Sequence, residues 1–385
     1  MSTLKLPILV FAFVLASLAS PSVAIETTAK NAYVIDVSTG TIMLDKASSE
    51  AKPPASTSKL MTIALLFKAL EEGKVSMDTT FKVSEKAWAM KGSKMFVELG
   101  SEVSVSDLLK GILVQSGNDA CVVVAEGLAG TEDKFAEQMN AYAVELGLSD
   151  SSFGNASGWP HPKQLMSARD LAKLAYFLYK TYPQHWSQFS EPEFTYNKIK
   201  QANRNPLLGV VQGADGLKTG HTEAAGYNLV GSVERNGRRI VLVLMGMSSE
   251  AERASEAERI ASWALNDFQA STEIKAGETI ATAKTWMGNA PEINLTTPSD
   301  FTTLKPIGTT GTIQASALFE EPLVAPLEKG TQVGIVRVTQ KNMPTYELPL
   351  VLAESLERGG FFSRFKQVVA NSLPRAKGSM AEAIN

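Results

Sequence analysis

Three short clusters hold the residues of this chain that could perform chemistry together. The first contains Ser56 and Lys59, the second contains Ser116 and Asn118, and the third is Lys218-Thr219-Gly220. A serine hydroxyl becomes a good nucleophile only when a base takes its proton, and a neutral amine can be that base. In this order the clusters offer a nucleophile, a base, a proton relay and a cation. These groups suit acyl transfer on a substrate that has a free carboxylate.

The histidines offer no obvious alternative base. The chain has three, His161, His185 and His221, and no Gly-x-Ser-x-Gly nucleophile elbow occurs. Lys59 is therefore the expected base, which requires a pKa well below its ordinary value of about 10.4. Burial and a second cation would both lower this pKa, and Lys218 is the candidate cation.

No pattern in the sequence indicates a metal or another cofactor. There is no His-Glu-x-x-His, no pair of cysteines, no spaced acidic loop and no glycine-rich phosphate loop after a strand. The single cysteine, Cys121, excludes an intramolecular disulfide. We expect it to be a buried, inert thiol, and the alternative is a thiol near the site that reagents could reach. The expected chemistry therefore uses side chains and backbone alone.

The first cluster lies at the start of a predicted helix. Apolar residues recur on one face from Leu60 to Leu70, and Gly73 ends the pattern. Ser56 and Lys59 are three residues apart, so a helix places both side chains on one face. The positive end of the helix dipole would also favour an anion that forms at Ser56.

The second and third clusters are expected at a helix break and on a strand. Residues 108–128 are mostly helical and apolar in pattern, and Gly117 predicts a bend that presents the second cluster to a cleft. Strands at 227–233 and 239–245 flank Asn236-Gly237, which is a strong hairpin signal. The third cluster precedes this hairpin, so we expect it on an edge strand.

Length and composition predict two folded units. The chain has 385 residues, more than one compact core usually holds, and its net charge of −3 gives no reason to expect nucleic acid. A hairpin at 32–44 and an amphipathic helix at 252–268 mark the two ends of the first unit. Short β-like runs rich in Thr, Val, Gly and Pro then predict a small all-β domain at 271–354, interpreted as a spacer or protein-contact module.

Residues 1–24 have the features of a secretory signal peptide. Lys5 provides a positive start, 6–18 form an apolar run, and Ser22-Val23-Ala24 provides small residues for cleavage after Ala24. The alternative is an N-terminal anchor that is not cleaved. Because the run is short for a membrane span and ends in small residues, export with cleavage is the preferred interpretation.

Residues 355–385 form a third kind of segment. After Gly359-Gly360, apolar residues follow helical spacing at Phe361, Phe362, Phe365, Val368, Val369 and Leu373. Basic residues surround them, with no acidic residue between Arg358 and Lys377. This pattern favours an amphipathic helix on an anionic membrane surface, and the alternative is a helix that packs on its own domain or on a partner.

Taken together, the clusters resemble those of the penicillin-binding proteins and serine β-lactamases. Within them, the chain resembles the low-molecular-weight D-alanyl-D-alanine carboxypeptidases, a serine-type, peptidase S11-like family. The resemblance rests on residues 54–62, 115–120 and 215–222 and covers nearly the whole chain. It implies an α/β (α+β) transpeptidase-like catalytic domain at 25–270 with an antiparallel sheet flanked by helices. The small all-β domain at 271–354 and a membrane-anchoring helix and tail at 355–385 would follow.

The resemblance also implies a role for each site residue. Ser56 would attack the carbonyl between two D-alanines, Lys59 would take its proton, and Ser116 would relay a proton to the departing amine. Asn118 would hold a substrate amide. Lys218 and Thr219 would hold the substrate carboxylate, together with Arg204, which could instead be a surface residue beside a turn. Gly220 and His221 would also be substrate-binding residues. The N–H groups of Ser56 and His221 would form the oxyanion hole.

The implied substrates are peptidoglycan stem peptides, and β-lactams would acylate Ser56 and leave slowly. The implied location is the periplasmic face of the bacterial inner membrane. A serine β-lactamase is one alternative, with Glu193 as the candidate base, although Glu193 lies late between the second and third clusters. A DD-endopeptidase with the same site and a catalytically silent wall-binding protein are the others. The loop at 88–95 is shorter than in the best-known members, which leaves the deacylation rate and substrate preference open.

Overall fold

The computed structural model describes residues 11–13, 25–307, 313–339 and 345–361. Contacts within the chain divide it into two compact units. One is Ser22–Gln269, and the other combines Met1–Pro21 with Ala270–Asn385. All three clusters lie in the first unit, so that unit contains the candidate active site.

The first unit is built on a five-stranded antiparallel sheet with the order β3-β2-β10-β9-β8. The strands, in chain order, are β2 (Asn31–Asp36), β3 (Thr41–Lys46), β8 (Ala214–Thr222), β9 (Gly226–Arg235) and β10 (Arg238–Met247). Asn236 and Gly237 both have positive φ, as a tight hairpin turn between β9 and β10 requires. β8 carries the third cluster at one edge of the sheet, which confirms the prediction of an edge strand.

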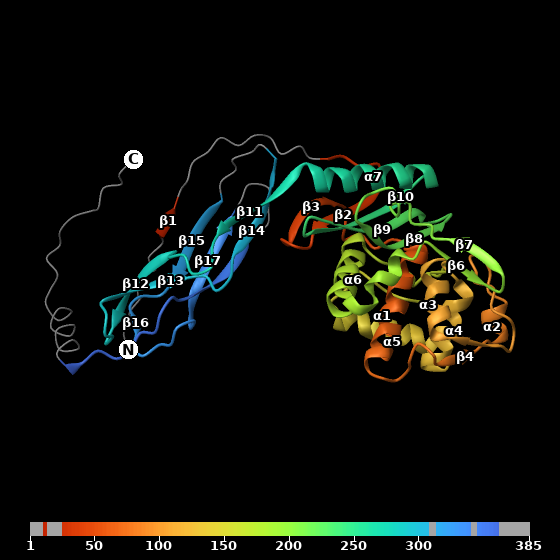
Figure 1. Ribbon diagram of the computed structural model, residues 1–385, viewed down its shortest axis with the longest axis horizontal. Helices are drawn as coiled ribbons and strands as arrows, with labels where there is room; N and C mark the ends of the chain where they lie inside the picture. Colours follow the sequence, from red (N-terminus) through yellow and green to blue (C-terminus); the bar gives the residue numbers. More distant parts are fainter. Residues whose placement is uncertain (1–10, 14–24, 308–312, 340–344, 362–385) are drawn as a thin grey trace. The chain divides into compact units, whose positions relative to one another are not determined.

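Helices cover both faces of this sheet (Figure 1). Successive side chains of a strand point to opposite faces, and β10 is apolar on both. Val241, Val243 and Met245 of β10 join the large apolar cluster formed with the helices on one face. Ile240, Leu242 and Leu244 pack with α7 (Glu250–Asn266) on the other. The predicted layered α/β architecture is therefore confirmed, although α7 ends two residues before Phe268, which begins a strand.

The remaining helices pack against the sheet or against one another. They are α1 (Lys59–Glu71), α2 (Glu85–Trp88), α3 (Val105–Leu113), α4 (Asn118–Ala129), α5 (Glu132–Glu145) and α6 (Ala168–Thr181), with 3₁₀ segments η1 (Ala55–Ser58) and η2 (Pro183–Ser190). Serine or threonine side chains cap several helices by accepting a hydrogen bond from the first turn, which satisfies an otherwise unpaired N–H group. Two small two-stranded antiparallel sheets complete the unit, β4 (Thr80–Lys82) with β5 (Glu102–Ser104) and β6 (Glu193–Tyr196) with β7 (Ile199–Ala202).

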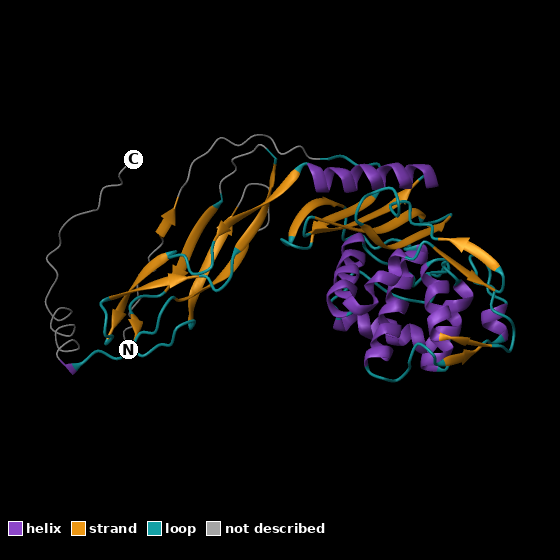
Figure 2. Ribbon diagram, viewed as in Figure 1, coloured by secondary structure: helices purple, strands orange, loops and turns teal. Residues whose placement is uncertain are grey.

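The described part of the second unit consists almost entirely of strands and the loops that join them (Figure 2). A seven-stranded sheet has the order β1-β15-β17-β18-β13-β12-β16, and a two-stranded sheet pairs β11 with β14. Their bounds are β1 (Phe11–Phe13), β11 (Phe268–Ile274), β12 (Ala281–Trp286), β13 (Glu292–Thr296), β14 (Phe301–Pro306), β15 (Gln314–Phe319), β16 (Leu323–Val324), β17 (Gln332–Thr339) and β18 (Tyr346–Leu352). These strands enclose their own apolar core, so the predicted all-β domain is confirmed.

The two predicted terminal segments lie largely outside the described residues. Of residues 1–24 the structure describes only β1, which pairs antiparallel with β15. Apart from Phe361, the predicted amphipathic helix falls on residues that the structure does not describe. Among the described residues, no helix combines the length and apolar character needed to cross a membrane.

Candidate active site

Ser56 and Lys59 meet at the junction of η1 and α1. Lys59 Nζ donates a hydrogen bond to Ser56 Oγ at 2.8 Å. The same amine donates to Asn118 Oδ1 at 2.7 Å and to the carbonyl oxygen of Ser157 at 2.5 Å. The Lys59 side chain is completely buried, while Ser56 is partly exposed. A hydroxyl that substrate can reach therefore lies within proton-transfer distance of a buried amine.

Ser116 lies in the break between α3 and α4. Its φ of 58° is left-handed, an uncommon conformation for a residue other than glycine, and it turns the chain sharply before Asn118 begins α4. Lys218 Nζ, from β8, donates a hydrogen bond to Ser116 Oγ at 2.9 Å. The structure thus brings all three clusters together, with two hydroxyls each bonded to a buried amine.

The two amines have lowered pKa values. The pKa of Lys59 is lowered to about 8, mainly by burial and in part by the positive charge of Arg204. Burial is also the main reason why the pKa of Lys218 is well below its ordinary value, followed by the positive charges of Lys59 and Arg204. Because each charge makes the other less favourable, the site disfavours the state in which both amines are protonated.

β8 passes very close to the backbone of Ser56. A Cβ atom at Gly220 would lie 2.9 Å from the carbonyl oxygen of Pro54 and 2.9 Å from the amide nitrogen of Ser56. Real Cβ atoms do not approach backbone atoms this closely, so only glycine allows this packing. Thr219 is buried beside Gly220, and its carbonyl accepts a second hydrogen bond from Lys218 Nζ at 3.1 Å.

His221 and Arg204 lie at the exposed edge of the site. The His221 ring stacks on Tyr227, with ring centroids 4.0 Å apart, and does not bond to either serine among the contacts of the described residues. Arg204 donates a hydrogen bond to Ser93 Oγ at 2.6 Å. Its positive charge lowers the pKa of both Lys59 and Lys218.

The loop at 88–95 borders the site and is held by a buried carboxylate. Asp119 accepts hydrogen bonds from the backbone N–H groups of Met95, Phe96 and Val97. The Lys91 carbonyl in turn accepts a bond from the Asn118 amide at 2.8 Å. Asp119 therefore positions a wall of the site without touching either serine.

Sequence reasoning missed the turn at 155–159. This turn brings the Ser157 carbonyl to Lys59, and Thr62 and Glu132 hold it by bonding to the backbone of Ala156. The run Asn155-Ala156-Ser157-Gly158 has the composition of a turn. Nothing in that composition identifies the lysine that the turn contacts, because the acceptor is a backbone group.

Two other predictions can be compared with the geometry. Cys121 is buried and free, as predicted, and burial raises the pKa of its thiol to about 12, which makes it inert. Glu193 forms an ion pair with Lys200 at 2.6 Å across the β6–β7 hairpin, and both side chains are exposed. Within the described part of the chain, no recorded hydrogen bond or ion pair links Glu193 to Ser56 or Lys59, and no group of three or more His, Cys, Asp or Glu could hold a metal.

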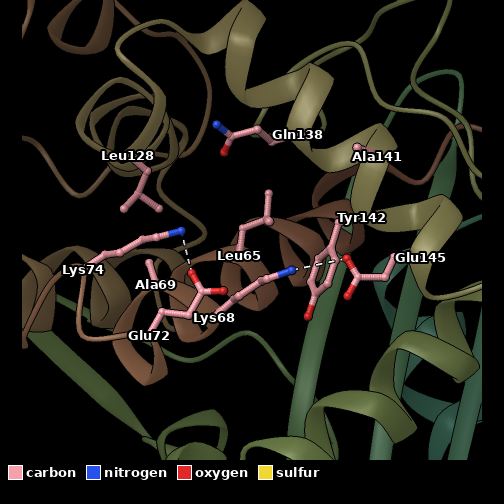
Figure 3. A pocket seen from close by; sticks show the side chains of 10 residues that line it. All are labelled: Leu65, Lys68, Ala69, Glu72, Lys74, Leu128, Gln138, Ala141, Tyr142 and Glu145. Atoms are coloured by element: carbon pink, nitrogen blue, oxygen red, sulfur yellow. Dashed lines mark hydrogen bonds and ion pairs between the residues drawn. The ribbon is translucent and has the colours of Figure 1, made fainter.

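A cavity of about 310 Å³ lies elsewhere, on the C-terminal half of α1, and is lined mainly by residues of α1, α4 and α5 (Figure 3). Its lining residues form two ion pairs, Lys68 with Glu145 at 3.3 Å and Lys74 with Glu72 at 2.6 Å. Lys68 also lies 4.2 Å from the ring centre of Tyr142. The cavity contains no residue of the three clusters, so it is separate from the candidate active site.

Comparisons with known proteins agree with both units. The family model for D-alanyl-D-alanine carboxypeptidase, peptidase S11, matches residues 17–249, and the model for the penicillin-binding protein 5 C-terminal domain matches residues 268–358. D-alanyl-D-alanine carboxypeptidase DacC of Escherichia coli (strain K12) is 37% identical over 339 residues, which cover 86% of this chain and 85% of that protein.

Solved structures of penicillin-binding proteins are also similar to this chain. Penicillin-binding protein 5 from Haemophilus influenzae has a TM-score of 0.77 and 32% identity, and the match covers 89% of this chain and all of that chain. Penicillin-binding protein D2 from Listeria monocytogenes, in its ampicillin-bound form, has a TM-score of 0.57 and 30% identity. That match covers 63% of this chain and 98% of that chain.

Proposed function

The chain belongs to the D-alanyl-D-alanine carboxypeptidase family, and on this premise we propose that Ser56 is its nucleophile and Lys59 the base that activates it. The protein is a serine-type hydrolase that removes the terminal D-alanine from peptidoglycan stem peptides. The observation that carries the assignment is the 2.8 Å contact between Ser56 Oγ and a buried lysine whose pKa is about 8. The resulting neutral amine can accept the serine proton at moderate pH.

Substrate binding would set the charges of the two amines. We infer that the terminal carboxylate of the peptide lies against Lys218, Thr219 and Gly220, with Arg204 at the exposed side. A carboxylate there favours the protonated form of Lys218. Repulsion from that charge then favours neutral Lys59, which lies next to the nucleophile. The substrate thereby promotes the protonation state that the reaction needs.

The reaction would then run in two stages. Ser56 Oγ attacks the carbonyl carbon between the two D-alanines while Lys59 takes the hydroxyl proton. The backbone N–H groups of Ser56 and His221 stabilise the oxyanion. Ser116, bonded to Lys218, relays to the departing D-alanine nitrogen the proton that Lys59 took from Ser56, which leaves Lys59 neutral again. Asn118 holds the amide of the remaining peptide. A water molecule then attacks the ester of Ser56 while Lys59 takes its proton, and return of that proton to Ser56 Oγ frees the shortened peptide.

A β-lactam would complete the first stage, acylation of Ser56, and would pass through the second stage only slowly. The amide of its ring takes the place of the scissile bond, and its carboxylate takes the place of the peptide terminus. Opening of the ring leaves the leaving group attached, so the acyl-enzyme on Ser56 is released slowly. The ampicillin-bound form of the Listeria relative supports this proposal for β-lactams.

The location and the domain limits are part of the same proposal. Residues 1–24 would direct export and be removed, 25–270 would form the catalytic domain, and 271–354 would form the β-rich domain. Residues 355–385 would hold the enzyme at the periplasmic face of the inner membrane, because basic residues surround an apolar stripe there. Peptidoglycan lies in that compartment, so substrate and enzyme would meet.

The test is release of D-alanine from diacetyl-Lys-D-Ala-D-Ala. Wild type should release D-alanine and become labelled by a fluorescent penicillin, and Ser56→Ala should do neither. Ser255→Ala is the matched control, because Ser255 is an exposed residue of α7, outside the three clusters. No D-alanine together with rapid hydrolysis of penicillin by the wild type would instead favour a β-lactamase.

A further inference from the structure

Trp159 is a large aromatic side chain that lies beside the second cluster. Trp159 keeps 42% of its surface in solvent. A Cβ atom at Gly92 would lie 2.8 Å from Cζ3 of Trp159 and 3.0 Å from Nδ2 of Asn118. The indole edge and the Asn118 amide therefore meet at the same glycine of the 88–95 loop. An exposed aromatic ring therefore lies next to Asn118.

The backbone of Trp159 is held in position by a tightly bonded turn. Asn155 Oδ1 accepts hydrogen bonds from the N–H groups of Ser157, Gly158 and Trp159, at 3.1, 2.8 and 3.1 Å. Asn155 Nδ2 donates to the carbonyl of Trp159 at 2.8 Å. The same turn directs the Ser157 carbonyl to Lys59, so the backbone that carries the indole has a fixed place relative to the base. A surface that is ordered before the ligand arrives loses little entropy on binding.

The position of Trp159 indicates which part of the substrate it meets. In the proposed function the terminal carboxylate lies at Lys218 and the scissile carbonyl lies at Ser56. Asn118 then holds the amide on the acyl side of that carbonyl. Trp159 adjoins Asn118, so it lies next to the residue that precedes the two D-alanines.

On the basis of the proposed function, we propose that Trp159 is a specificity-determining residue that packs against a long aliphatic side chain at this position. An indole offers a large, flat and rigid apolar surface, which suits a run of methylene groups better than a methyl group. A polar group at the far end of the side chain can stay in water while the methylenes cover the ring.

The experiment compares two substrates on the full-length chain. Diacetyl-Lys-D-Ala-D-Ala has the long side chain, and acetyl-Ala-D-Ala-D-Ala ends in the same two residues without it. The kcat/KM for D-alanine release is measured for wild type, Trp159→Ala and Trp159→Phe. Tyr176→Ala is the control, because Tyr176 is an aromatic residue of α6 with 41% exposure. Labelling by fluorescent penicillin verifies that each variant has an intact site.

We expect wild type to prefer the lysine substrate about tenfold, as burial of about two methylene groups would give. Trp159→Ala should lose this preference mainly through the lysine substrate, Trp159→Phe should keep most of it, and Tyr176→Ala should match wild type. An equal fall on both substrates, or an unchanged preference in Trp159→Ala, would overturn the inference. Release from both substrates at equal rates by wild type would also overturn it and leave the proposed function intact. Release from neither would refute the proposed function itself.

Discussion

At the scale of single residues, the site depends on two lysines that are buried without a carboxylate partner among their described contacts. Lys59 bonds to Ser56, Asn118 and a backbone carbonyl, and Lys218 bonds to Ser116 and a second carbonyl. These neutral acceptors do not offset the cost of removing two ammonium groups from water. The lowered pKa values follow from this arrangement, and they make an amine usable as a base.

The pH dependence of the reaction should reflect Lys59. A base must be unprotonated, and below pH 8 Lys59 carries a proton, because its pKa is about 8. The kcat/KM for D-alanine release should therefore rise with pH through a value near 8 and level off above it. Steady-state kinetics between about pH 5.5 and 10 would measure this rise in kcat/KM. A flat profile from about pH 6 to 9, or a limb near 10.4, would rule out Lys59 as the base.

At the scale of elements, loops rather than helices complete the site. The loop at 88–95 borders the site because Asp119 accepts hydrogen bonds from three backbone N–H groups at and just after its end. The turn at 155–159 reaches it because Glu132, whose other oxygen pairs with Lys86 at 2.8 Å, bonds to the backbone of Ala156. Buried carboxylates thus fix irregular segments that have no regular secondary structure of their own.

Asp119→Asn should weaken the first of these loops. An amide has one acceptor oxygen instead of two, and its NH₂ group would face backbone donors. We expect a loss of roughly 1–3 kcal/mol in the free energy of unfolding and a lower kcat/KM, since Asn118 bonds to the same loop. Urea unfolding and D-alanine release would measure the two effects. Asp78→Asn, at an exposed turn, serves as the control, and equal stability of the two variants would contradict the role given to Asp119.

The elements themselves were largely predictable, and the loop contacts were not. Asn236-Gly237 identifies the β9–β10 hairpin because few residue pairs tolerate positive φ at two successive positions. Apolar spacing identifies α1, and with it the shared face of Ser56 and Lys59. The Ser157 carbonyl and the three N–H groups at Asp119 are backbone partners, which every residue type provides. Their identity depends on tertiary folding, so no residue pattern reveals them.

At the scale of the whole molecule, the catalytic groups and the proposed anchor lie in different parts of the chain. All three clusters belong to the unit Ser22–Gln269, whereas the proposed membrane segment ends the second unit. The second unit has its own apolar core and its own sheet. Removal of the terminal segment should therefore leave the catalytic chemistry intact.

Deletion of residues 361–385 tests this separation in cells. The full-length protein should sediment with the membrane, and the shortened protein should appear in the soluble periplasmic fraction, because the basic apolar segment is gone. Labelling by fluorescent penicillin should remain, which shows an intact Ser56. If the full-length protein is already soluble, the proposed anchor is wrong.

The close packing at Gly220 has a consequence for the evolution of drug resistance. A target enzyme usually escapes an inhibitor through substitutions that reshape the wall of its site while its own reaction survives. Here any side chain at Gly220 would press on the amide nitrogen of Ser56, 2.9 Å from the added carbon, and so displace the proposed oxyanion donor together with the nucleophile. Such a variant would resist the drug, but it would also lose its own catalytic activity. An inhibitor whose affinity depends on the close packing of Gly220 against Ser56 would therefore leave this route of escape closed.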